Sequence, residues 1–236
     1  MNVISLGYTC YVKSLIQESN LKKNTDIFDW MNSFEFNKNI KSLDNKFNIF
    51  ENIVKSPIDI DLNSNTVYYN PIYSFRLPHE TNLNDSKQNY ARRYERFINY
   101  KNSNEKFVFI RQINRGRYDV PAEKLESNYN DEMYAKIISY LPAQSIILLI
   151  TDEKLSLDDK RNISDNFILL DNSISPEHIA YGDYLSYKND IIKYYNELFK
   201  YINKNFNKID INIMKELIKN EKIGINQDIA HVKRVK

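Results

Sequence analysis

The single cysteine of this 236-residue chain, Cys10, is the side chain best suited to covalent chemistry. It follows an apolar segment, Val3–Gly7, that is typical of a buried strand. The pattern over Tyr11–Glu18 predicts a helix directly afterwards, with Thr9 as its N-cap. A thiol at a helix N-terminus lies at the positive end of the helix dipole, which favours the nucleophilic thiolate. Cys10 is therefore a candidate catalytic nucleophile. The alternative is a structural cysteine, because free cysteines are often buried.

A thiol nucleophile needs a base, and the chain contains three histidines. His178 follows the predicted strand Asn166–Asp171, so it is expected at the same sheet edge as Cys10. His79 lies at the end of a long inserted segment that could carry it onto the site. His231 lies near the end of the chain and is not expected to be held in place. Each histidine has a simpler alternative role, at the surface or as a cap.

Two neighbouring residues, Asp29 and Trp30, form a polar and aromatic pair in an otherwise apolar stretch. The carboxylate of Asp29 is expected either to cap a turn or to orient the catalytic base. Backbone N–H groups between Gly7 and Cys10 are candidates for stabilising an oxyanion. We count Gly7, Tyr8 and Trp30 among the candidate substrate-binding residues.

Three arginines are candidates for binding an acidic substrate group. Arg92 and Arg96 are four residues apart and share one face of a predicted helix. Arg111 ends a predicted strand and should reach the edge of the sheet. Together they could hold a carboxylate or a phosphate through paired hydrogen bonds. The alternative is an internal salt-bridge network with nearby acidic residues (Asp29, Glu95 or Glu123).

Strands and helices must position these residues. Their sequence patterns predict an α/β fold with an open, mainly parallel sheet of about four to five strands flanked by helices. Continuous apolar segments indicate strands covered on both faces, and they are Val3–Gly7, Phe107–Arg111, Ser145–Thr151 and Asn166–Asp171. Helical patterns lie between them, at Tyr11–Glu18, Lys87–Tyr100 and Asp131–Tyr140. The alternation of strand and helix favours right-handed crossovers in a single domain spanning residues 1–236.

Two regions do not follow this alternation. Residues 21–84 are predicted to form an aromatic-rich inserted or lid-like segment after the first helix. It is expected to contain a helix near Asn37–Phe50 and two strands, Thr66–Asn70 and Tyr73–Leu77. Residues 184–220 are predicted to form C-terminal helices, the first of which packs one apolar face on the core. Residues 228–236 are expected to be a frayed tail.

Composition excludes several classes of function. The net charge of +2 argues against nucleic-acid binding, and four glycines are too few for a glycine-rich phosphate loop. The longest apolar run, Ile146–Ile150, is too short to cross a membrane, and the first residues do not resemble a signal peptide. One cysteine excludes a disulfide framework, and no cofactor or metal is expected. The abundance of Asn, Ile, Lys and Tyr is typical of an AT-rich genome. We expect a cytoplasmic protein, in the host cytoplasm if the source is a virus.

Several motifs occur together in a characteristic order: Ser5-Leu6-Gly7-Tyr8-Thr9-Cys10, Phe28-Asp29-Trp30, Phe75 with His79-Glu80, Arg92-Arg93 with Arg96-Phe97, and Phe107–Arg111. This combination resembles the putative papain-like cysteine peptidases (domain of unknown function 1796), a family of bacteria and large viruses, over roughly residues 2–115. The resemblance implies that Cys10 is the nucleophile and that His79 matches the family's histidine. The family's His-Asp-Phe element here reads His79-Glu80-Thr81. In papain-like enzymes the cysteine opens a helix and the histidine comes from a later antiparallel sheet.

Three functions are compatible with these residues. The first is a cysteine-dependent hydrolase or acyl transferase acting on a small molecule, a peptide or a glycan, with Cys10 as nucleophile and His79 or His178 as base. The second is a glycosyl- or other group-transferase that binds a phosphorylated or acidic substrate through its arginines. The third is a non-catalytic binding or host-interaction protein.

Overall fold

The computed structural model describes residues 1–7, 10–21, 24–33, 35–60, 66–80, 82–113, 131–151, 167–171 and 184–208. It divides the chain into two compact units, Met1–His178 and Ile179–Lys236. The second unit contains α5 (Tyr184–Asn205), which begins at the residue where the C-terminal helices are expected to start. The packing of this helix on the core stays a prediction. The rest of the predicted C-terminal helices, from residue 209 to 220, and the predicted tail lie outside the described residues.

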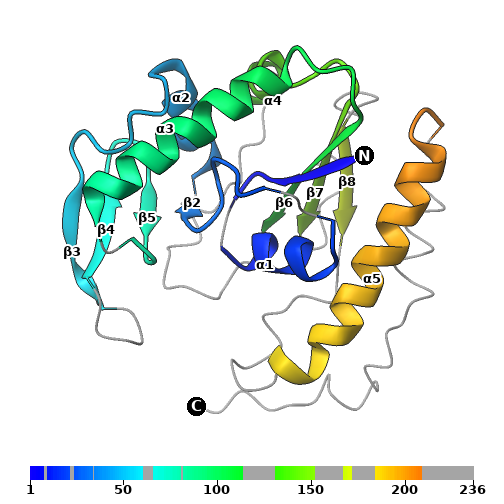
Figure 1. The fold of residues 1–236 in the computed structure, drawn as a ribbon, viewed down its shortest axis with the longest axis horizontal. Coiled ribbons are helices and arrows are strands. Elements are labelled where there is room, and N and C mark those ends of the chain that lie inside the picture. Colours follow the sequence, from blue (N-terminus) through cyan, green and yellow to red (C-terminus); the bar gives the residue numbers. More distant parts are fainter. Residues whose placement is uncertain are drawn as a thin grey trace. The chain divides into compact units, whose positions relative to one another are not determined.

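The first unit is built on a parallel sheet, which confirms the predicted α/β fold (Figure 1). Its described strands lie in the order β1-β6-β7-β8, and each neighbouring pair is parallel. The strands are β1 (Asn2–Ser5), β6 (Phe107–Ile113), β7 (Ser145–Thr151) and β8 (Phe167–Asp171). Their continuous apolar sequences are explained by burial, since helices cover both faces of the sheet.

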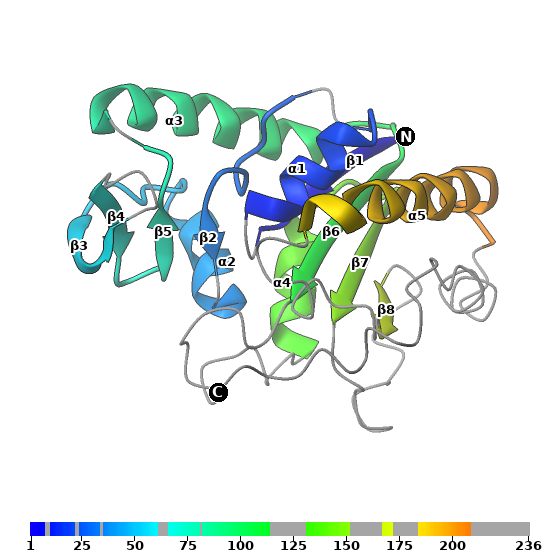
Figure 2. The same ribbon diagram turned by 90° about the horizontal axis from the view of Figure 1, so that it is seen from below.

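The helices described in this unit are α1 (Cys10–Glu18), α2 (Phe36–Asp44), α3 (Leu83–Tyr100) and α4 (Asp131–Tyr140). On one face of the sheet, Ile4, Phe109 and Ile147 belong to a buried cluster that also contains residues of α2, α3 and α4. Strand side chains alternate between faces, and α1 contacts β1 and β6. Figure 2 shows α1 and α4 on opposite faces of the sheet.

The inserted segment contains an antiparallel sheet that is larger than the sequence predicted. Its described strands lie in the order β2-β5-β4-β3, rather than as the expected pair. They are β2 (Asn32–Ser33), β3 (Val54–Ile60), β4 (Thr66–Asn70) and β5 (Phe75–Leu77). Strand β3 contains Pro57, which argues against a central strand, but β3 lies at an edge of the sheet where proline is tolerated. Strand β2 is too short to leave a sequence pattern.

Two helix boundaries differ from the prediction for local reasons. Helix α2 ends at Asp44 rather than near Phe50, because Lys46 and Phe47 adopt positive φ angles of 49° and 55°. Helix α3 begins at Leu83 rather than Lys87. The side chain of Asn82 accepts hydrogen bonds from the first-turn N–H groups of Asn84 and Asp85, at 3.0 and 3.3 Å.

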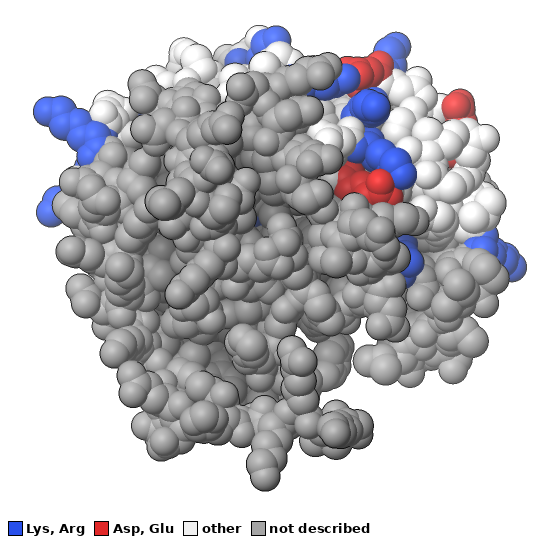
Figure 3. Space-filling view, turned by 180° about the vertical axis from the view of Figure 1, so that it is seen from behind, with Lys and Arg blue, Asp and Glu red and all other residues white. Residues whose placement is uncertain are grey.

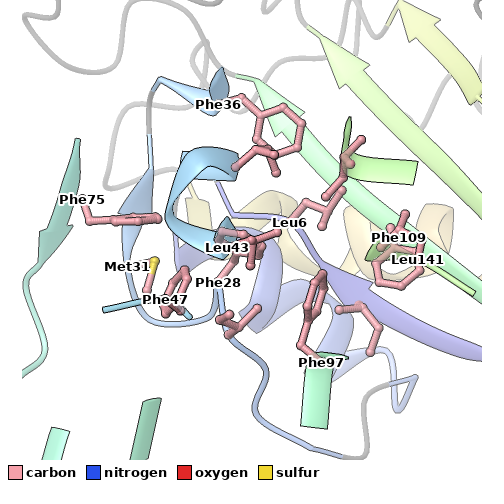
Figure 4. Close-up of a cluster of buried hydrophobic side chains, with 14 of the residues drawn as sticks. Leu6, Phe28, Met31, Phe36, Leu43, Phe47, Phe75, Phe97, Phe109 and Leu141 are labelled. Atoms are coloured by element: carbon pink, nitrogen blue, oxygen red, sulfur yellow. The ribbon is translucent and has the colours of Figure 1, made fainter. Parts of the chain in front are cut away.

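An aromatic core joins the insertion to the parallel sheet (Figure 4). The Phe28 ring contacts Phe47, Phe75 and Phe97, with ring centroids 5.6, 6.3 and 6.0 Å apart. Phe97, on α3, in turn packs against Phe109 of β6 at 6.2 Å. Residues from the insertion, a crossover helix and the sheet therefore share one hydrophobic core.

On the face shown in Figure 3, lysine and arginine side chains are scattered among the described residues, with acidic side chains beside some of them. This distribution agrees with the small net charge of +2. Within the part of the chain that the structure describes, no helix is both long and apolar enough to cross a membrane.

A polar contact between α2 and α4 makes stability depend weakly on pH. Lys136 and Tyr140 both donate hydrogen bonds to the carboxylate of Asp44, and they hold its pKa below the ordinary value of 3.8. The pair is half-exposed, so we expect Lys136→Met to lower the free energy of unfolding by less than about 1 kcal/mol at neutral pH. The loss should fade as the pH falls through the depressed pKa of Asp44, because protonation removes the interaction. Urea unfolding at pH 7 and pH 3 measures this, and an equal loss at both pH values would contradict it.

Candidate active site

The nucleophile candidate opens the first helix. Strand β1 ends at Ser5, the N–H of Leu6 still donates to the carbonyl of Ile110 at 2.6 Å, and α1 begins at Cys10. The backbone of Cys10 therefore lies just beyond the C-terminal end of a parallel strand, where open α/β sheets bind their ligands. Tyr8 lies outside the described residues.

Gly7 shapes the turn between β1 and α1. Its φ of +82° lies in the left-handed region that favours glycine, and a Cβ at this position would lie 2.2 Å from the hydroxyl oxygen of Ser33. The N–H of Gly7 donates to the hydroxyl of Ser5 at 3.0 Å, so it already has a partner within the turn. The backbone donors for an oxyanion are thus expected further along, at the start of α1.

Arg111 is almost fully buried, and its guanidinium contacts backbone carbonyls. It is only 1% exposed. One guanidinium nitrogen donates to the carbonyl of Leu6 at 2.8 Å, and another donates to the carbonyl of Ser33 at 2.6 Å. The guanidinium also lies over the Phe36 ring, 4.2 Å from its centroid. Arg111 therefore connects β6 with the end of β1, with β2 and with the start of α2.

The other two arginines lie in different surroundings. Arg92 is exposed on α3 and donates to the side chain of Asn89. Arg96 donates to the carbonyl of Thr25, and its Nε lies 3.7 Å from a carboxylate oxygen of buried Asp26. The expected internal salt bridge is thus present for Arg96, with Asp26 rather than with the acidic residues named from the sequence. The structure does not bring Arg92, Arg96 and Arg111 together around one binding position.

Asp29 stabilises the turn that precedes Trp30. A carboxylate oxygen of Asp29 accepts the backbone N–H of Asp26 at 2.6 Å, and the N–H of Asp29 donates to the carbonyl of Asp26 at 3.2 Å. The carbonyl of Asp29 accepts the hydroxyl of Tyr90 at 3.1 Å. Burial raises the pKa of Tyr90, which keeps this hydroxyl protonated and able to donate. This is the turn-capping arrangement that the sequence suggested for Asp29; its orienting of a base stays a prediction.

Trp30 contacts both the helix α1, which Cys10 opens, and a histidine. The ammonium of Lys13, on α1, lies 3.5 Å from the centroid of the indole ring. The ring of His79 lies 5.4 Å from the Trp30 ring at an interplanar angle of 76°, which is an edge-to-face contact. His79 is exposed and lies in the turn directly after β5. His178 lies outside the described residues.

Sequence reasoning missed Lys13. Its charge predicts a solvent-facing position, yet only 4% of its surface is exposed. One signal could have singled it out, namely its spacing of three residues from Cys10, which places both positions on one side of a helix.

We expect Gly7→Ala to lower the free energy of unfolding by at least about 2 kcal/mol, because it adds backbone strain to a steric clash. Ser33→Ala is the matched background, since it removes the oxygen that lies 2.2 Å from the added Cβ. In the Ser33→Ala background, Gly7→Ala should lower the free energy of unfolding by less, although the backbone strain at positive φ remains. Chemical denaturation of the four variants measures this. Equal losses in both backgrounds would show that the contact with Ser33 is not the cause.

We expect Arg111→Met to lower the free energy of unfolding by about 2–4 kcal/mol, because the buried carbonyls of Leu6 and Ser33 lose their donors. Arg92→Met is the control, because this exposed arginine should be replaceable within about 0.5 kcal/mol. Urea unfolding followed by circular dichroism compares the two. A stability of Arg111→Met equal to that of Arg92→Met would contradict the structural role of Arg111.

Comparison with known proteins agrees with the motifs around this site. The family described as putative papain-like cysteine peptidase (domain of unknown function 1796) matches residues 1–153 of the chain. The match includes Cys10, Asp29, Trp30 and His79, and it ends before His178. No curated protein and no solved structure matches the chain. With well over half of its length matched, the chain belongs to the family of putative papain-like cysteine peptidases.

Proposed function

We propose that this protein is a cysteine-dependent hydrolase or acyl transferase in which Cys10 is the nucleophile and His79 the base. The observation that carries the proposal is the contact of one indole ring, Trp30, with both α1 and His79. This contact links the histidine to the helix that Cys10 opens. Membership in the family supports the class of chemistry.

The position of Cys10 favours a reactive thiol. The first N–H groups of a helix have no partner within the helix, and the helix dipole places partial positive charge at this end. Both effects stabilise a thiolate relative to a thiol. The same N–H groups suit an oxyanion that forms within reach of the sulfur.

The reaction would follow the usual course of acyl transfer to a thiol. The sulfur of Cys10 attacks the carbonyl carbon of the substrate while the imidazole of His79 takes the thiol proton. The backbone N–H groups at the start of α1 stabilise the tetrahedral oxyanion. The imidazole then gives the proton to the leaving group, and a thioester with Cys10 remains. Water or another acceptor, deprotonated by the same imidazole, attacks the thioester and restores the thiol.

Two observations favour His79 over His178 as the base. The family match covers His79 and ends at residue 153, before His178. His79 also follows β5 of an antiparallel sheet, as the family resemblance implies for the histidine of a papain-like enzyme. We propose that Asp29 acts indirectly, by fixing the turn that holds Trp30. The substrate would be a small molecule, a peptide or a glycan with a reactive carbonyl, and a cytoplasmic location would keep the thiol reduced.

Alkylation by iodoacetamide tests the proposal cleanly, because Cys10 is the only thiol in the chain. We expect the folded protein to react faster at pH 7 than the chain unfolded in urea. His79→Asn should slow the reaction by about tenfold or more, because the thiolate loses its imidazole partner. His178→Asn and His231→Asn are matched controls that should react as the wild type does. Slow alkylation that none of these substitutions changes would overturn the proposal, and slowing by His178→Asn alone would assign the base to His178.

The same variants separate thiol reactivity from acyl transfer. With p-nitrophenyl acetate, the wild type should release a burst of p-nitrophenolate as the acetyl group moves to Cys10. Cys10→Ala should abolish this burst, and His79→Asn should slow it. A reactive thiol that gives no burst would contradict acyl-transfer chemistry.

A further inference from the structure

Lys13 is an unusual residue to find inside a protein. Lysine is almost never fully buried without a partner, because removing an ammonium from water is costly. Lys13 is 4% exposed, and its ammonium lies over the face of the Trp30 ring and donates to the side chain of Gln17. A cation over an indole face is worth roughly 2 kcal/mol when both groups are desolvated. The contact with Trp30 therefore helps to offset the burial of this charge.

Trp30 in turn adopts an unfavourable backbone conformation. Its φ is +62°, which is a genuine outlier for a bulky side chain. Such strain persists only where the surroundings impose it. Here the hydroxyl of Tyr90 holds the carbonyl of Asp29, directly before Trp30, and the ammonium of Lys13 holds the ring.

The Trp30 ring restricts the orientation of His79. His79 lies in an exposed turn, and its imidazole meets the Trp30 ring in an edge-to-face contact. An edge-to-face contact between aromatic rings contributes about 0.5–1.5 kcal/mol, enough to favour one orientation several-fold. The series Lys13, Trp30, His79 thus runs from the buried side of α1 to an exposed imidazole.

We propose that Lys13 is a positioning residue, which fixes the Trp30 ring through its charge and thereby orients His79. The link to catalysis rests on the proposed function, since it requires His79 to be the base. The contact between Trp30 and His79 can be measured without any catalytic assay.

The test uses the fluorescence of Trp30, the only tryptophan in the chain. A protonated imidazole in contact with an indole quenches its emission, so the wild type should lose emission as the pH falls from 8 to 5, where histidines titrate. His79→Asn should abolish this change, whereas His178→Asn and His231→Asn should leave it intact. If His79→Asn keeps the pH-dependent change in emission of the wild type, the change does not come from the contact between Trp30 and His79, and the proposal is overturned.

Two substitutions at Lys13 separate its charge from its bulk. Lys13→Met keeps the apolar stem and should lose most of the pH-dependent change in emission. Lys13→Arg keeps a cation that stacks well on aromatic rings and should retain it. If Lys13→Met does not fold, Lys13→Gln replaces it, with the same loss expected. If folded Lys13→Met, or Lys13→Gln in its place, keeps the full pH-dependent change in emission, the proposal is overturned.

Alkylation of Cys10 in the same variants distinguishes this inference from the proposed function. If both hold, Lys13→Met slows alkylation towards the rate of His79→Asn, and Lys13→Arg restores it. If His79→Asn slows alkylation but Lys13→Met does not, the positioning role is wrong and the proposed function stands. If Lys13→Met abolishes the fluorescence titration while alkylation is indifferent to His79, Lys13 orients the imidazole but the proposed function is wrong.

Discussion

The buried guanidinium of Arg111 is the interaction on which the arrangement of both sheets depends. A charge inside a protein is tolerated only where polar groups surround it, and here backbone carbonyls from two distant segments do so. Leu6, at the end of β1, and Ser33, in β2, lie 105 and 78 residues from Arg111 in the sequence. Besides the shared aromatic core, one polar side chain therefore connects the parallel sheet with the antiparallel sheet, because it reaches from β6 to both. Because β2 pairs with β5, this also constrains the strand that precedes His79.

Two separate routes link the start of α1 with His79 and with β5, the strand that precedes it. One runs from the turn at Gly7 through the guanidinium of Arg111 to β2, and from β2 through strand pairing to β5. The other runs through side chains, from Lys13 through Trp30 to His79. The Gly7 turn belongs to the first route, because Ser33 lies so close to Gly7 that only a residue without a side chain fits. Cys10 follows a strand of the parallel sheet and His79 follows a strand of the antiparallel sheet, so neither sheet alone fixes the separation of these two residues.

The parallel sheet was predictable because burial of a strand on both faces leaves a continuous apolar segment in the sequence. Strand β7 and helix α4 have the bounds that the sequence predicted. The antiparallel sheet was only half predictable, since β2 has two residues and β3 contains Pro57. The burial of Lys13 and of Arg111 was harder to predict, because hydrophobic periodicity assigns charged residues to the surface. Their partners, an indole ring and carbonyls far away in sequence, become visible only in the fold.

The shared aromatic core also determines how the molecule can open. Phe28, Phe47 and Phe75 come from the insertion, yet Phe28 also packs against Phe97, which in turn packs against the parallel sheet. Swinging the insertion away as a body would expose these rings to water at about 2 kcal/mol each. That cost approaches the whole stability of an ordinary domain. The insertion and the sheet should therefore behave as one cooperative unit in hydrogen exchange, so that only individual loops and side chains open independently of the rest.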